Sequence, residues 1–275
     1  MTASIVWGGV CSHTGAMMRA PKVGEGEGDR VARVFSAFDE LAASLHKSGA
    51  QVLVTIATDH FLTFDYANLP VFSIGTGAKF RGHGEFGVPQ RDFDGVEELG
   101  EAVHASLVRG GFDAASARAM PLDHSFSCPL QLMFKTRSMP VLPIYVNCTV
   151  PPLPTLERCL AFGKALGQAL RAQSVVDRVA VVGTGGISHW VGMPQTGTIN
   201  EEFDMRFLDD FTHGRFEDVA KYDSEDVIRK AGNGAAEIRN WLVAAGACNS
   251  RAARQLAYEP VHAWSTGIGV LEMVP

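Results

Sequence analysis

Three apolar runs of the sequence each carry a histidine at or near their carboxyl end. They are SIVWGGVCSH at 4–13, QVLVTIATDH at 51–60 and VVGTGGISHW at 181–190, with His13, His60 and His189. Short runs rich in valine and isoleucine are typical of buried strands. Ligands of open α/β sheets bind beyond the carboxyl ends of the strands, so the three imidazoles could share one crevice. A single histidine there more often only bonds a nearby carbonyl, but three together favour a shared site.

Two of these histidines, His13 and His60, are candidate metal ligands, because neutral imidazole binds iron, zinc and copper. A divalent ion needs a further ligand, and the candidate is Glu237 in GNGAAEIRNW at 232–241. A glutamate in the first turn of a helix is equally well explained by the helix dipole. Two histidines and a carboxylate leave three octahedral positions open, as in non-haem Fe(II) oxygenases. Zinc more often takes a tetrahedral set with one open position.

Two other features concern His189 and His124. Gly183, Gly185 and Gly186 precede His189 and let the backbone turn sharply or approach a ligand closely. The competing interpretation of GTGGIS as a phosphate loop is disfavoured, because the lysine and the spacing of such loops are absent. His124 lies in PLDHSFSCPL, which we interpret as a polar turn before a short apolar run.

The alternation of strand and helix patterns predicts an α/β fold with a mixed central sheet flanked by helices. We expect strands at 4–11, 51–58, 70–75, 139–147, 178–184 and 267–274, and helices near 30–47, 95–109, 155–173, 200–212 and 234–245. The glycine-rich segments 22–29 and 75–95 predict surface loops. We expect one catalytic domain spanning residues 1–275, because the sequence contains neither an internal repeat nor a long low-complexity linker.

The composition excludes several classes of protein. The net charge is −6 without a basic run, which argues against nucleic acid or an anionic membrane surface as the main partner. No stretch approaches 18 apolar residues, so we expect no membrane span. The five cysteines form no CxxC pair, and no signal peptide is recognised at the N-terminus. We therefore expect a cytoplasmic protein.

Taken together, the motifs resemble those of the type III extradiol ring-cleavage dioxygenases, and the resemblance covers almost the whole chain. The matching pieces are SHTGAM at 12–17, DHF at 59–61, DHSFSCPL at 123–130, MPVLPIYVN at 139–147, GTGGISH at 183–189, INEEFD at 199–204, EIRNW at 237–241 and GIGVL at 267–271. The resemblance implies that His13, His60 and Glu237 hold Fe(II). It also implies that His189 is the catalytic acid/base and His124 a second active-site histidine.

The resemblance further implies an aromatic substrate with adjacent oxygen donors, opened with O2. The family accepts catechols, gallates, aminophenols and hydroxypyridones, and no lysine or arginine adjoins these motifs in a way that demands a carboxylated ring. Candidate pocket residues are Trp190, Met193, His262 and Trp264. We expect a homo-oligomer, and the need for a small partner subunit stays an open question. The alternatives are a zinc-dependent hydrolase and a catalytically inactive metal-binding relative on the same scaffold.

Overall fold

The central sheet has eight strands in a computed structural model, which describes residues 3–18 and 27–274. The order across the sheet is β6-β3-β7-β2-β8-β1-β10-β9. The strands are β1 (Ser4–Cys11), β2 (Val52–Ala57), β3 (Phe72–Gly75), β6 (Ala115–Ala117), β7 (Val141–Val146), β8 (Arg178–Thr184), β9 (Ala252–Val261) and β10 (Thr266–Val274). Neighbours from β7 to β1 are parallel, whereas β10 is antiparallel to both β1 and β9, and β3 is antiparallel to β7. The expected mixed sheet is therefore confirmed.

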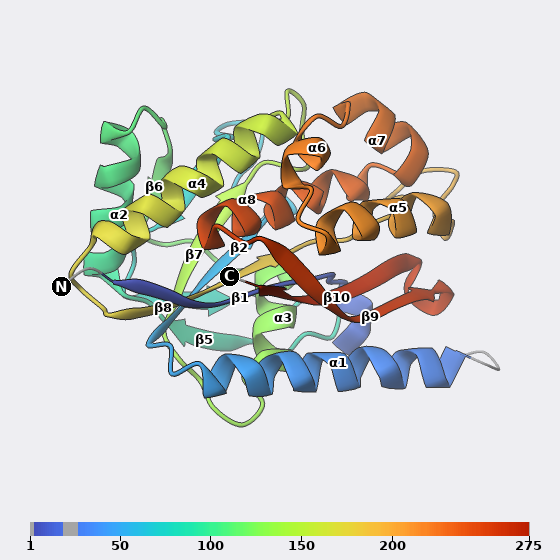
Figure 1. Cartoon of the computed structure of the whole chain (residues 1–275), viewed down its shortest axis with the longest axis horizontal. Helices are drawn as coiled ribbons and strands as arrows, with labels where there is room; N and C mark the ends of the chain where they lie inside the picture. Colours follow the sequence, from blue (N-terminus) through green and yellow to red (C-terminus); the bar gives the residue numbers. More distant parts are fainter. Residues whose placement is uncertain (1–2, 19–26, 275) are drawn as a thin grey trace.

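Helices cover both faces of this sheet (Figure 1). On one face lie α2 (Glu97–Arg109), α4 (Leu156–Ala172), α5 (Glu201–Thr212), α6 (Phe216–Ala220), α7 (Ser224–Ala231) and α8 (Ile238–Cys248). On the other face lie α1 (Glu27–Lys47) and α3 (His124–Met133). Each face has its own hydrophobic core, and every residue of β2 and β7 is buried. Such two-sided burial explains why these strands are continuous apolar runs.

The first long helix illustrates how the sequence dictates packing. In α1, Val31, Val34, Phe38, Leu41 and Leu45 recur at intervals of three or four and are all buried. This spacing places them along one stripe of the helix, which faces the sheet. The apolar stripe, together with the acidic first turn and the basic last turn of α1, agrees with the predicted helix at 30–47.

Some sequence-based expectations are wrong. Segment 75–95 is not all loop, because β4 (Lys79–Gly82) pairs with β5 (Arg91–Asp94) as an antiparallel hairpin. The polar turn expected around His124 is the start of α3, with Asp123 as its N-cap. Of the expected loop 22–29, residues 27–29 begin α1, and 22–26 lie outside the described residues. Across the described ranges, no helix is both long and apolar enough to cross a bilayer.

Candidate active site

Three adjacent parallel strands bring the histidines of the sequence motifs together. β2, β8 and β1 are neighbours in the sheet, so their carboxyl ends meet at one edge. His13, His60 and His189 follow these strands, and all three line one cavity of about 390 Å³. This volume falls within the range of small-molecule sites.

Two of the imidazoles that line the cavity lie close to one buried carboxylate behind the lining, that of Glu237. Glu237 Oε1 lies 3.6 Å from His13 Nε2 and 3.3 Å from His60 Nε2. His13, His60 and His124 also offer ring nitrogens that all lie within 4.8 Å of one another. Burial would raise the pKa of Glu237, but the nearby His13 and His60 lower it to about 2. The arrangement provides the donor types and the separation that a transition metal requires.

Glu237 reaches this cluster from a helix start. It ends the 3-10 turn η2 (Gly234–Glu237), directly before α8. Its Oε2 accepts a hydrogen bond of 2.6 Å from the backbone N–H of Gly186. A Cβ at Gly185 would come within 2.7 Å of the Glu237 Cβ, so the close approach of these segments requires glycine there. The glycine turn after β8 thus holds the carboxylate.

His60 is fixed by Asp123, a residue to which sequence analysis gave no role. Asp123 Oδ2 accepts from both the backbone N–H of His60 (2.8 Å) and its Nδ1 (2.7 Å), which leaves Nε2 toward Glu237. Asp123 Oδ1 also accepts from the backbone N–H of Ser125 at 2.9 Å, which caps α3. Burial opposes ionisation of Asp123, but the charge of His60 lowers its pKa far below the usual range. In the sequence, only the position of Asp123 directly before His124, in DHSFSCPL, draws attention to this carboxylate.

His189 occupies a slot between two glycines. A Cβ on Gly186 would lie 2.2 Å from the ring of His189, and one on Gly234 would lie 2.0 Å from it. The backbone N–H of His189 donates to the carbonyl of Ala231 at 2.8 Å. Burial lowers the pKa of His189. The ring Nδ1 lies 3.3 Å from the backbone carbonyl of Ile187, and the imidazole lines the cavity.

Ser188, beside His189, is anchored by a buried carboxylate on α5. Asp204 Oδ1 accepts from the Ser188 backbone N–H, and Oδ2 accepts from the Ser188 hydroxyl, both at 2.8 Å. The hydroxyl of Tyr258 donates to the same Oδ2 at 2.7 Å. Burial raises the pKa of Asp204 to about 6. This network fixes the backbone that presents His189.

His124 completes the inner wall of the cavity. Its ring stacks on that of His60, with 4.4 Å between centroids, and meets Phe86 edge-on at 5.1 Å. Glu85 Oε1 accepts from His124 Nδ1 at 2.6 Å. Glu85 and Phe86 lie between β4 and β5, in the segment expected to be only a loop, and carried no sequence motif.

The four residues expected to form the pocket are placed differently from one another. Trp264 is buried and lines the cavity, together with Val191 and Thr266. Trp190, Met193 and His262 lie outside the lining, and Met193 is exposed. The chain therefore turns Val191, rather than its neighbours, toward the histidines.

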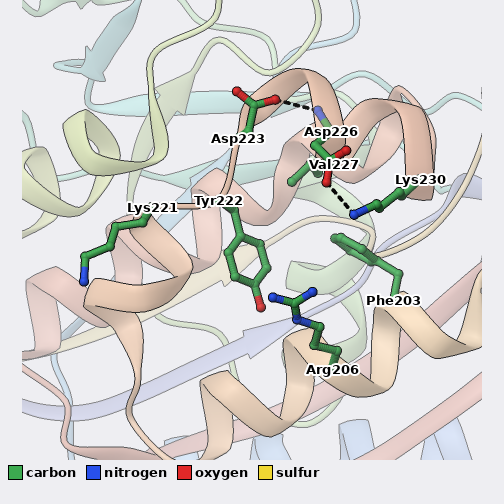
Figure 2. A pocket seen from close by; sticks show the side chains of 8 residues that line it. All are labelled: Phe203, Arg206, Lys221, Tyr222, Asp223, Asp226, Val227 and Lys230. Carbon is green, nitrogen blue, oxygen red and sulfur yellow. Dashed lines mark hydrogen bonds and ion pairs between the residues drawn. The ribbon is translucent and has the colours of Figure 1, made fainter.

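A second hollow, between α5 and α7, lacks this chemistry (Figure 2). Its lining includes Phe203, Arg206 and Tyr222, and Lys230 forms an ion pair with Asp226 at 2.5 Å. Arg206 lies over the Tyr222 ring, 5.4 Å from its centroid. None of the lining residues is a histidine, and the charged groups largely pair with each other, so we place the candidate site in the first cavity.

Comparisons with known proteins agree with this geometry. A family model described as the catalytic LigB subunit of aromatic ring-opening dioxygenase matches residues 9–269. A 2,3-dihydroxyphenylpropionate/2,3-dihydroxicinnamic acid 1,2-dioxygenase of Rhodococcus globerulus is 27% identical, over 88% of this chain and 91% of its own. A Pseudomonas putida protein of the same description is 27% identical, over 88% and 93%.

A solved structure extends the similarity to the fold. It is an uncharacterized protein of Escherichia coli K12, with a TM-score of 0.61 and 13% identity over 98% of this chain and 100% of that one. At this identity the likeness concerns architecture alone. The family match spans nearly the whole chain, and its dioxygenases are metal-dependent. The chain therefore belongs to the family of catalytic LigB subunits of aromatic ring-opening dioxygenases, and it is a ring-cleaving oxidoreductase.

Proposed function

We propose that this protein is an Fe(II)-dependent extradiol dioxygenase, with His13, His60 and Glu237 as the iron ligands. The observation that carries the proposal is the approach of both histidine Nε2 atoms to one oxygen of Glu237, at 3.6 and 3.3 Å. Two imidazoles and one carboxylate are the ligand set of non-haem Fe(II) oxygenases.

The surroundings of His60 fit a resident metal. Ligating histidines generally give their second ring N–H to a carboxylate, which fixes the tautomer and the ring. The 2.7 Å contact of His60 Nδ1 with Asp123 has this form. Fe(II) at this position would supply coordination of two adjacent ring oxygens and activation of O2.

The protein's own residues would bind the ring and move its protons. The apolar lining of Ala16, Val191 and Trp264 accommodates a flat ring. His189 has a lowered pKa and is therefore mainly neutral near pH 7, so it can accept a hydroxyl proton and later return it. General acid/base help of this kind contributes roughly 10²- to 10⁴-fold. His124, held by Glu85, is the second histidine within reach of the ring.

The substrate class is a ring with adjacent oxygen donors: a catechol, gallate, aminophenol or hydroxypyridone. The relatives' names specify a dihydroxylated phenyl ring, which supports the oxygen pair. A zinc hydrolase remains the second candidate, because His13, His60 and His124 also form a three-histidine set of the kind that binds catalytic zinc.

Metal analysis and oxygen uptake together distinguish the two. We expect about one Fe(II) per chain in protein purified without air, and stoichiometric O2 consumption with ring opening on a catechol panel. Zinc-loaded protein should consume no O2. Hydrolysis of esters by the zinc form, with no oxygen uptake by the iron form, would overturn the proposal.

We also propose that residues 1–275 act as one catalytic domain in the cytoplasm. A sheet containing both β1 and β10 supports the first point, and five unpaired cysteines support the second. The homo-oligomer stays a prediction, and the need for a small partner subunit stays an open question. Analytical ultracentrifugation and turnover by the purified chain alone test them.

A further inference from the structure

Glu85 is a carboxylate in the cavity wall that the proposed mechanism uses only as a partner of His124. It lies in the segment between β4 and β5, and its side chain is 24% exposed. The hairpin is tied to the start of α3 by two backbone hydrogen bonds of 2.8 Å, from Leu122 N–H to the carbonyl of Arg81 and from His83 N–H to the carbonyl of Leu122. Glu85 and His124 each follow this junction by two residues, so the fold itself brings them together.

The position of Glu85 is well defined. Its Oε1 accepts from both the backbone N–H (2.9 Å) and Nδ1 (2.6 Å) of His124. The next residue, Phe86, packs so closely on Gly15 that a Cβ at Gly15 would lie 2.5 Å from the Cβ of Phe86. Gly84 and Gly87 have φ of +81° and +89°, which lets the chain turn tightly around these residues. A carboxylate held this way presents a fixed charge to the cavity.

The other lining residues do not balance this charge with a lysine or arginine. Within the described part of the chain, Glu85 is the one acidic residue in the lining, and none is lysine or arginine. The hydrogen bond from His124 is the main cause of a lowered pKa, so Glu85 is ionised near neutral pH. Its second oxygen, Oε2, has no hydrogen-bond donor among the described residues.

We propose that Glu85 determines substrate specificity, by excluding rings with an anionic substituent and favouring a neutral substituent that donates a hydrogen bond to Oε2. A substrate carboxylate beside Glu85 would meet a like charge with no lysine or arginine of the described lining between them. An amide or amine N–H would instead satisfy Oε2. The inference rests on the proposed ring-cleavage function, and it narrows the substrate class to uncharged rings with a donor group.

A matched pair of probes tests this selectivity. They are 3-(2,3-dihydroxyphenyl)propionate and its primary amide, which have nearly the same shape but differ in charge. We expect Fe(II)-loaded protein to prefer the amide in kcat/KM by roughly 10- to 100-fold, the effect of one like charge about 6–10 Å away at an effective dielectric constant of about 20. Glu85→Gln should bring this ratio close to 1. Glu85→Asp should retain most of the preference.

The control is Glu98→Gln, which removes the same charge from an exposed position on α2 and should leave the ratio unchanged. Equal use of the two probes by the unmodified protein, or an unchanged ratio in Glu85→Gln, would overturn the inference. Anaerobic calorimetric binding of both probes provides the same ratio without turnover. If neither probe nor catechol is opened, the function proposal fails, and the binding ratio still decides the role of Glu85.

Discussion

Asp123 holds His60 at two points, through the backbone N–H at 2.8 Å and through the ring Nδ1 at 2.7 Å. One carboxylate oxygen accepts both bonds, so the main chain and the imidazole are set together. The same side chain caps α3 through Ser125. The orientation of His60 is thus coupled to the start of the helix that carries His124.

Asp123→Asn is expected to weaken metal binding by roughly 10- to 100-fold, the usual cost of losing such a partner. The amide cannot accept with the same charge, so His60 loses its orienting anion. Metal affinity is measured by competition with a chelator of known affinity. Asp113→Asn, at an exposed position, is the control and should bind normally. Equal affinities of the two variants would contradict the positioning role of Asp123.

Glu237 is the proposed third metal ligand and His124 the alternative, and substitution distinguishes the two assignments. Glu237→Gln should lose most of the iron, because the carboxylate is 3.3 Å from His60 Nε2. His124→Ala should retain the iron and lose turnover. The readouts are iron per chain and oxygen uptake. Full iron in Glu237→Gln together with iron loss in His124→Ala would transfer the ligand role to His124.

His189→Ala should keep near-normal iron and a measurable anaerobic substrate complex. Turnover should fall by roughly 10²-fold or more, the scale of lost acid/base catalysis. Alanine is preferred to phenylalanine for this test, because the ring slot between Gly186 and Gly234 is narrow. Single-turnover ring opening provides the rate. Loss of iron with an intact circular dichroism spectrum would instead make His189 a ligand.

Gly234→Ala tests whether the position of the His189 ring matters, because it changes the slot and retains the imidazole itself. Its new Cβ would lie 2.0 Å from His189 Nε2, so the imidazole must move. We expect turnover to fall by at least roughly tenfold, while iron content changes little. Gly28→Ala is the control, because the position is helical and, beyond its own helix, no atom of the described residues lies within 4 Å of the added Cβ. That variant should turn over normally and gain up to about 1 kcal/mol of stability.

The raised pKa of Asp204 leads us to expect that the stability of the fold depends on pH. Burial raises its pKa to about 6, so the folded protein holds a proton that the unfolded chain releases between about pH 4 and 6. Stability from this group is therefore present below about pH 4 and lost as the pH rises through 6. Relative to Asp204→Asn, the metal-free protein should lose up to about 3 kcal/mol of unfolding free energy between pH 4 and 7. The unfolding free energy of both proteins is measured by urea denaturation at each pH. The same dependence on pH in the two proteins would contradict the role of Asp204.

Much of the fold follows from the sequence because the central strands are buried on both sides. Val52–Ala57 and Val141–Val146 must be apolar throughout, so periodicity identifies them. The edge strand β9 is only intermittently buried, and the polar residues Arg254, Gln255 and Glu259 interrupt its apolar pattern. In α3, Pro129 lies inside the helix and obscures a helical pattern that the Asp123 cap stabilises. Local signals alone cannot reveal such elements.

The same distinction applies to the candidate site. His13, His60 and His189 follow strands, so the rule for parallel sheets anticipates that they meet. Asp123 and Glu85 act through partners that only tertiary structure supplies. Glu85 depends on the junction of β4 with Leu122, and no spacing within the sequence encodes that junction. Val191 lines the cavity and Trp190 does not, and no residue pattern in the sequence distinguishes these two neighbours.

The pairing of β1 with β10 has a consequence for how the protein folds. The first strand lies between β8 and β10, so the sheet is completed only when distant parts of the sequence have met. Closing such long loops costs entropy and slows folding. The site joins residues after β1 and β2 to one at the start of α8, and no early hairpin contains it. We therefore expect metal to bind only after most of the fold has formed. Bound metal should then lower the unfolding rate and leave the folding rate nearly unchanged, because its site is absent from the folding nucleus.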